Sequence, residues 1–126
     1  AKELGVFDEV RFVGKQEQME DILAIADLFL LTSEYESFGL AALEAMAAGV
    51  PVISTNAGGL GEINVEGVTG YLADVGDIST MTAKAISIIK DDTILNGFKE
   101  RAANHAKTFD ISRVVPVYEK LYERFL

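Results

Sequence analysis

Two glutamates stand out, because their types, spacing and surroundings could serve a phosphorylated, hydroxyl-rich ligand. Glu36 and Glu44 have seven residues between them, and their segment joins an apolar run to a helical one. A carboxylate accepts hydrogen bonds from hydroxyl groups, and the unpaired amides of a helix N-terminus favour an anion. A rise of ~1.5 Å per residue separates the two carboxylates by roughly 8–12 Å. That separation is about the span of a sugar diphosphate.

The start of the helix between these glutamates is the candidate anion site. The amides of four consecutive residues would point at the ligand: Ser37, Phe38, Gly39 and Leu40. Gly39, which lacks a side chain, would let a ligand approach the backbone closely. A strand–turn–helix junction containing a glycine also occurs for structural reasons alone, so both interpretations stay open at this point.

Glu44 is the single charged residue between Phe38 and Gly49. A helix that is apolar on every side is typical of a buried helix, and a glutamate is rarely buried without a partner. Glu44 is therefore expected to be buried, where it faces either a cation of the same chain or a ligand with hydroxyl groups.

The elements that position these residues alternate in type through the first half of the chain. Helical patterns cover Met19–Ala26 and Leu40–Ala48, and a short helix is expected at 60–63. Apolar, β-rich runs predict strands at Val10–Val13, Leu28–Thr32, Pro51–Ser54 and Gly70–Leu72. This alternation predicts an α/β fold: a partial Rossmann-like domain whose short parallel sheet has about four strands and helices on both faces.

Helical spacing dominates the second half. Three helices are expected, at Ile78–Lys90, Thr93–Phe109 and Ile111–Leu126, the first capped by Asp77 or Ser79. The second carries one apolar stripe, formed by Leu95, Phe98, Ala102 and Ala106. We therefore expect one domain over residues 1–126, with an α/β part at about 6–77 and a helical tail at about 78–126.

Composition excludes several classes of partner. Eleven Lys and Arg against twenty Asp and Glu give a formal charge of −9, which disfavours binding to nucleic acid or to anionic lipid. Asp27 and Glu44 interrupt the apolar stretches, so no stable membrane insertion is expected. The absence of cysteine suits a reducing compartment, and a cytoplasmic location is expected. Residues 1–5 read as the tail of a helix that ends at Gly5, so the chain is expected to be a fragment that starts partway through a sheet.

The segment from Glu36 to Glu44, followed by Gly49-Val-Pro51 and Gly58-Gly59, resembles the retaining GT-B glycosyltransferases of the glycogen-synthase and sucrose-synthase type, and is similar to glycosyltransferase family 4. The likeness continues through Gly67-Val-Thr-Gly70 and covers nearly the whole chain. Val10–Gln16 is also similar to the narrower group of these enzymes that joins N-acetylglucosamine to malate.

The resemblance implies half of a GT-B domain that binds a nucleotide-diphosphate sugar, with a UDP-sugar expected, and takes part in hexosyl transfer. It implies that Glu36, the catalytic-site residue, contacts donor-sugar hydroxyls, and that Glu44 takes the ribose hydroxyls. The amides around Phe38, Gly39 and Leu40, with Ser37, would meet the distal phosphate and the sugar. A loop of Gly14, Lys15 and Gln16 would lie near the base. No cofactor and no metal are expected.

The chain also departs from the resembled pattern. The phosphate-binding Arg and Lys of these enzymes lie upstream of the first residue, and the N-terminal acceptor domain is missing. The fragment alone is therefore expected to be inactive. The alternative is a non-catalytic α/β scaffold or assembly module derived from such an enzyme.

Three further segments carry weaker signals. Gly58-Gly59 is either a turn that needs a positive φ or a loop near the donor. His105, on a polar helix, is expected to be a solvated side chain. Tyr118, Tyr122 and Phe125 share one helical face, and self-association through exposed helical faces is expected.

Overall fold

The computed structural model describes residues 1–125, and the α/β class with a parallel sheet is confirmed. Within these residues the sheet has three strands in the order β1-β2-β3: β1 (Phe29–Leu31), β2 (Val52–Thr55) and β3 (Gly70–Ala73). Both pairings are parallel, with Phe29 opposite Val52 and Val52 opposite Gly70. No helix over residues 1–125 combines the length and the apolar character needed to cross a bilayer.

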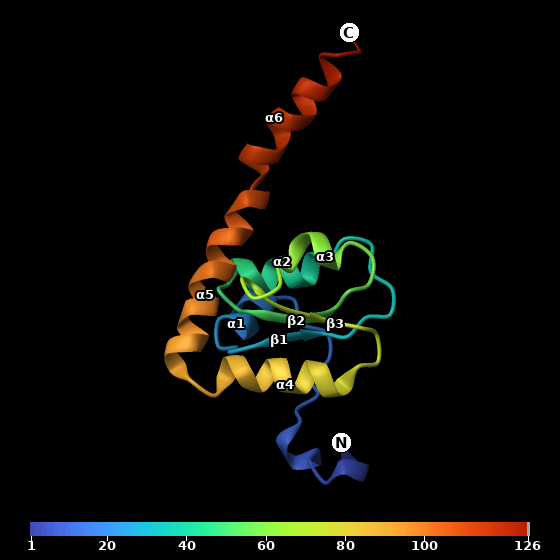
Figure 1. The fold of residues 1–126 in the computed structure, drawn as a ribbon, viewed down its shortest axis with the longest axis vertical. Coiled ribbons are helices and arrows are strands. Elements are labelled where there is room, and N and C mark those ends of the chain that lie inside the picture. Colours follow the sequence, from blue (N-terminus) through green and yellow to red (C-terminus); the bar gives the residue numbers. More distant parts are fainter. Residues whose placement is uncertain (126) are drawn as a thin grey trace.

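Helices cover both faces of this sheet, as Figure 1 shows. On one face lie α1 (Met19–Leu23), α2 (Leu40–Ala47) and α3 (Leu60–Ile63), and on the other lies α4 (Ile78–Ile89). Helix α5 (Asp92–Ala106) runs along one end of the sheet and contacts both α2 and α4. The result is a three-layer arrangement in which the central strand β2 is buried throughout, as its apolar sequence requires. The edge strand β1 is less covered, since Leu30 is 58% exposed.

Two hydrophobic cores hold the layers together. The first lies between the sheet and α2, and its fully buried members include Met46, Val52 and Leu60. The second lies under α4 and includes Ile53 and Ile88. Helix α5 joins the two cores through the predicted stripe, all of whose members are buried: Leu95, Phe98, Ala102 and Ala106.

The predicted strand at Val10–Val13 does not form, so the expectation of about four strands is wrong for residues 1–125. The segment has no strand partner, and the Phe12 side chain is 80% exposed. Figure 1 shows this N-terminal part of the chain running behind α4 from beyond the layered body. An extended segment becomes a strand only when a neighbouring strand supplies hydrogen bonds, and local composition does not supply that neighbour.

A buried polar network ties the end of α3 to the sheet. The Asn64 amide nitrogen donates to the Val52 carbonyl at 3.2 Å, to the Ser54 hydroxyl at 2.9 Å and to the Tyr71 carbonyl at 3.0 Å. The Asn64 side-chain oxygen accepts from the Thr69 hydroxyl at 2.9 Å. Because every member has a partner, burial of these polar groups is compensated, and the network fixes α3 against β2 and β3.

Helix α6 (Ile111–Tyr122) leaves this body and projects away from it (Figure 1). Asp110 caps its first turn by accepting a hydrogen bond from the Ser112 amide at 2.9 Å. Its predicted apolar face is exposed at Tyr118, Tyr122 and Phe125, and the neighbouring Val117 and Leu121 are exposed as well. Leu126, the predicted last residue of this helix, lies outside the described residues.

Candidate functional site

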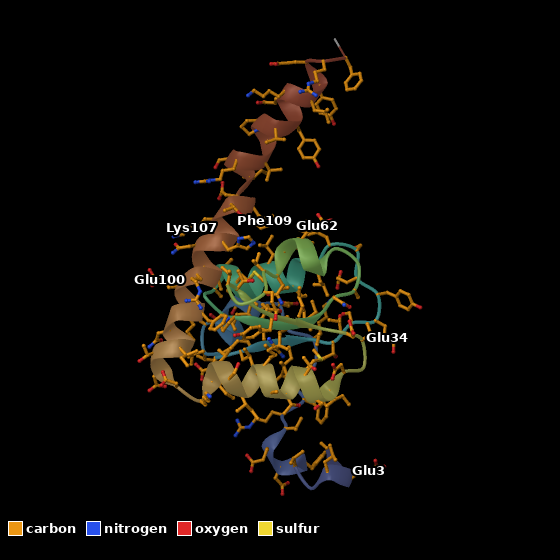
Figure 2. The ribbon with its side chains drawn as sticks, in the orientation of Figure 1. Glu3, Glu34, Glu62, Glu100, Lys107 and Phe109 are labelled. Atoms are coloured by element: carbon orange, nitrogen blue, oxygen red, sulfur yellow. The ribbon has the colours of Figure 1, made fainter. Side chains whose placement is uncertain are left out.

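The loop that carries the first glutamate lies where the parallel strands end. Strand β1 ends at Leu31, and residues Ser33–Gly39, here called the acidic loop, lead from it into α2. The carboxyl ends of parallel strands form the edge at which open α/β sheets bind ligands. Figure 2 shows Glu34 of this loop at that edge, with its side chain directed outward.

The N-terminus of α2 has no capping side chain in the described chain. Aspartates cap the three longest helices, α4, α5 and α6: Asp77, Asp91 and Asp110. At α2 the cap position is Gly39, whose φ of +95° places it in the left-handed region that favours glycine, and its first turn holds no acidic residue. The first amides of α2 are therefore left for an external acceptor or for water.

Gly39 has a packing role that the sequence does not reveal. A Cβ added at this position would lie 2.6 Å from Cδ2 of Leu60. The space that the missing side chain leaves is thus filled by the Leu60 side chain of α3, which gives this glycine a structural reason of its own. The absence of a side chain at Gly39 lets the start of α2 pack against Leu60 of α3, and it also permits the left-handed backbone conformation of the cap position.

Glu36 lies within the acidic loop and is partly buried. One of its carboxylate oxygens accepts a hydrogen bond from the Ser37 amide at 3.1 Å. The Glu36 carbonyl oxygen accepts from the Gly59 amide at 3.4 Å. The backbone of Glu36 is therefore held by the segment that follows β2, and its carboxylate lies beside the start of α2.

Glu44 is exposed, which corrects the expectation of a buried carboxylate. Helix α2 is apolar all round, yet only its inner face, with Ala42, Ala45 and Met46, is buried against the sheet. The outer face carries Glu44 among exposed apolar residues such as Leu40, which is 63% exposed. In the described residues Glu44 forms no ion pair, so an internal salt bridge does not explain it.

Two hollows flank Glu44. The larger, of about 530 Å³, lies between α1 and α2, and its lining includes Glu17, Met19, Leu23, Glu44 and Ala48. The smaller, of about 330 Å³, lies between α2 and the end of α5, and its lining includes Leu40, Glu44, Lys107 and Phe109. Figure 2 shows Lys107 and Phe109 close together where α5 ends. Glu44 thus stands on a ridge between two largely apolar hollows.

The predicted base-binding loop lies next to the larger hollow in sequence. Gly14, Lys15 and Gln16 are exposed, and the Gln16 side-chain amide folds back to donate to the Val13 carbonyl. The lining of the hollow begins at the very next residue, Glu17. The structure therefore brings the chain that follows this loop beside Glu44, while the three loop residues do not themselves line the hollow.

Three contacts hold the acidic loop, and of these only the one at Gly58 had a local sequence signal. The Thr55 hydroxyl donates to the Ser33 carbonyl at 2.6 Å. Phe109 packs edge to face on Phe38, with ring centroids 6.4 Å apart. Gly58 has φ +52°, and an added Cβ would lie 1.7 Å from the Glu36 carbonyl oxygen. Gly58 therefore serves both as a turn and as a place of close backbone approach to the acidic loop.

His105 is partly buried, which corrects its predicted solvated position. Its Nε2 lies 3.0 Å from the Ile63 carbonyl oxygen, and its ring packs on Phe109 with centroids 5.3 Å apart. Because both ring contacts bind α5 to α3 and to the following turn, His105 has a structural role beside the smaller hollow.

Comparison with known proteins gives consistent results. The family described as "Glycosyl transferases group 1" matches residues 1–106. The chain is 44% identical over 122 residues to N-acetyl-alpha-D-glucosaminyl L-malate synthase of Bacillus anthracis, which covers 96% of this chain and 32% of that protein.

Two solved structures match the fold closely. Sucrose-phosphate synthase from Thermosynechococcus elongatus has a TM-score of 0.88 and 28% identity, covering 98% of this chain and 32% of that one. Anabaena HepE in complex with UDP-glucose has a TM-score of 0.86 and 29% identity, covering 97% of this chain and 34% of that one. The chain thus spans about a third of the length of the proteins that it matches.

Proposed function

The chain belongs to the glycosyl transferases group 1 family, as the resemblance to GT-B enzymes predicted, and on this basis we propose that it is the part of a glycosyltransferase that holds the nucleotide-sugar donor. The observation that carries the proposal is the position of Glu44. It is an exposed, unpaired carboxylate on an apolar helix face, between two hollows, within the part of the chain that the structure describes. A UDP-sugar is the proposed donor, which the UDP-glucose complex of HepE supports.

The nucleoside is proposed to occupy the larger hollow. Its apolar wall, formed by Met19, Leu23 and Ala48, suits the flat face of a base, and the Glu44 carboxylate would accept hydrogen bonds from the two ribose hydroxyls. Gly14, Lys15 and Gln16, which precede this wall, would close over the base. A hydroxyl pair is a better partner than an anion here, because Glu17 and Glu44 make the hollow acidic.

The phosphates are proposed to lie at the N-terminus of α2. Its first amides lack a capping side chain, whereas α4, α5 and α6 are each capped by an aspartate. Amides of Phe38, Gly39 and Leu40 would therefore meet the distal phosphate, and the positive end of the helix dipole would favour its charge. The proposed contact of Ser37 requires its amide to exchange the Glu36 carboxylate, to which it donates without ligand, for the phosphate. The family's phosphate-binding Arg and Lys are proposed to come from outside these 126 residues.

The sugar is proposed to lie beside Glu36, whose carboxylate would orient the donor-sugar hydroxyls. In transfer with retention, the bond between the anomeric carbon and the phosphate oxygen breaks, and the acceptor oxygen bonds to that carbon on the same face. The released phosphate oxygen takes the acceptor proton. Glu36 would hold the hexosyl group in place, and binding is proposed to need no metal.

Catalysis is proposed to require a separate acceptor-binding domain. The chain spans about a third of its relatives, and the outer face of α2 is apolar and exposed at Leu40. We therefore propose that the 126 residues alone bind the donor weakly and do not transfer a sugar.

A cytoplasmic location is proposed for the same reason as before, the absence of cysteine.

The alternative function is an assembly module without chemistry. The exposed apolar face of α6 supports it, since Val117, Tyr118 and Tyr122 are each more than half exposed. Such a surface favours association with another protein surface or with a second copy. This function does not require Glu36 or Glu44, so ligand binding distinguishes the two proposals.

Titration of the ¹⁵N-labelled chain with UDP-glucose tests the donor-binding function. At millimolar ligand, with EDTA present, amide signals of residues 38–44 should shift, whereas those of the opposite face, in α4, should stay unchanged. A folded chain whose signals at 38–44 do not move with UDP-glucose, while its size distribution shows self-association, would support the assembly module instead.

A further inference from the structure

The segment from Thr55 to Leu60 contacts the acidic loop at its beginning, its middle and its end. This segment leads out of β2 and into α3, and it is separated from the loop by the whole of α2. At the beginning of the loop, the Thr55 hydroxyl donates to the Ser33 carbonyl at 2.6 Å. The contacts at the middle and the end are made by the backbone of Gly58 and Gly59 and by the side chain of Leu60.

Thr55 is well suited to hold the beginning of the loop. It is 1% exposed, and it is the last residue of the central strand, in register with Ala73 of β3. Its backbone is therefore fixed by the sheet, and its β-branched side chain has little rotational freedom. A hydrogen bond from such a hydroxyl fixes the beginning of the loop relative to the sheet.

The middle and the end of the loop lie in close contact with the segment from Gly58 to Leu60. The Gly59 amide donates to the Glu36 carbonyl at 3.4 Å, and Gly58 leaves no room for a Cβ beside that carbonyl. At the end, the Leu60 side chain fills the space beside Gly39. Elsewhere the loop is open, since Tyr35 is 92% exposed. The three contacts consequently set where the backbone of Glu36 lies.

We propose that Thr55 is a positioning residue, which acts through the Ser33 carbonyl to hold Glu36 where the donor sugar binds. The inference rests on the proposed donor-binding function, and it assigns to Thr55 an effect on the sugar and not on the nucleoside. Glu44 lies in α2 beyond the three contacts, so its position depends on the packing of that helix and not on the Thr55 hydroxyl.

The variant Thr55→Val tests this, since it keeps the shape of the side chain and removes only the hydroxyl. Thr55→Ser retains a hydroxyl that can donate the hydrogen bond to the Ser33 carbonyl. Thr69→Val is the matched control: Thr69 is fully buried and its hydroxyl also bonds within the fold, but to Asn64 at 2.9 Å, outside the three loop contacts. Both valine variants should lose stability, which makes stability alone an insufficient measure.

The first measurement is made on the chain without ligand. Heteronuclear NOE values and amide exchange should show greater mobility at residues 34–38 in Thr55→Val, and wild-type mobility in Thr55→Ser and Thr69→Val. Unchanged mobility at 34–38 in a folded Thr55→Val variant would overturn the inference, whatever the chain binds.

The second measurement compares UDP-glucose with UDP. Loss of one hydrogen bond is expected to weaken UDP-glucose binding by Thr55→Val roughly three- to ten-fold, with UDP binding unchanged. Thr55→Ser and Thr69→Val should both bind UDP-glucose with the affinity of the wild type. Equal weakening of both ligands would show a merely structural role and overturn the inference. If the wild-type chain binds neither ligand, the donor-binding function fails, and the mobility measurement alone decides whether Thr55 holds the loop.

Discussion

The rings of Phe38 and Phe109 meet edge to face, with their centroids 6.4 Å apart. Phe38 belongs to the acidic loop, and Phe109 lies in the 3-10 turn Lys107–Phe109 between α5 and α6. This contact joins the candidate donor site to the point where α6 leaves the body of the protein. His105 also packs edge to face with the Phe109 ring, at 5.3 Å between centroids, so Phe109 contacts one ring of the acidic loop and one of α5.

Replacing Phe109 with alanine should therefore destabilise the chain and disturb the acidic loop. Because Phe109 is partly buried against the first core, the loss should be about 2 kcal/mol, less than for a fully buried Phe. Urea unfolding measures the loss, and NMR shifts at Phe38 report the loop. Phe12→Ala, at an 80% exposed position, is the matched control and should change neither. Equal stability of the two variants would contradict this account.

The Asn64 network predicts a second, larger effect on stability. Asn64→Ala removes three donated hydrogen bonds and one accepted bond, and leaves buried partners such as Ser54 without them. We expect a loss of about 2–4 kcal/mol in the free energy of unfolding. Asn56→Ala, which removes an exposed bond to Asp74, is the control and should cost less than about 1 kcal/mol. Similar losses in the two variants, measured by thermal and urea unfolding, would show that burial of the network does not matter.

The caps of α4 and α6 predict how stability depends on pH. The hydroxyl and amide of Thr80 lower the pKa of Asp77 below its usual 3.8, and those of Ser112 do the same for the pKa of Asp110. A pKa that is lower in the folded chain means that the unfolded chain binds protons more readily. The caps therefore stabilise the chain fully above about pH 4, and this contribution is lost as the pH falls through the folded-state values.

Thermal unfolding between pH 6 and pH 2.5 tests this dependence. The melting temperature should fall more steeply below about pH 4 in the wild type than in the double variant Asp77→Asn, Asp110→Asn. The variant Asp8→Asn, at a residue of the 3-10 turn Phe7–Glu9, matches one charge change and should keep the wild-type slope. An identical slope in all three proteins would exclude the caps as its source.

Much of the fold follows from local patterns in the sequence. The helix at Leu60–Ile63 and the buried stripe from Leu95 to Ala106 match the prediction because periodicity reports which face packs inward. Asp77 caps α4 as one of the two predicted candidates. By contrast, Val10–Val13 has strand composition but no strand partner, and pairing depends on residues far away in the chain.

In the candidate site, too, the features encoded by neighbouring residues were predictable, and those that depend on distant residues were not. The placement of Glu36 in a loop and of Glu44 on the following helix was predictable, because the strand, the loop and the helix are each locally encoded. The exposure of Glu44 was not, since an apolar helix surface does not say whether another element covers it. The bond from Thr55 to Ser33 and the contact of Phe109 with Phe38 join segments distant in sequence, and single-residue patterns carry no signal for either.

The central claim is that the Glu44 carboxylate binds the ribose of the donor, and the variant Glu44→Gln tests it most directly. Glu44 is exposed and forms no ion pair in the described residues, so the substitution should leave the melting temperature unchanged. The variant Glu100→Gln matches the change in charge on the outside of α5, away from α2 (Figure 2), and should bind like the wild type.

The decisive measurement is the ratio of the Kd values for 2′-deoxy-UDP and UDP, determined by NMR titration of the three proteins. In the wild type and in Glu100→Gln, UDP should bind roughly ten-fold more tightly, because its 2′-hydroxyl donates to a charged carboxylate. In Glu44→Gln the ratio should fall towards one. A ratio that is the same in Glu44→Gln as in the wild type would contradict the assignment of Glu44 to the ribose.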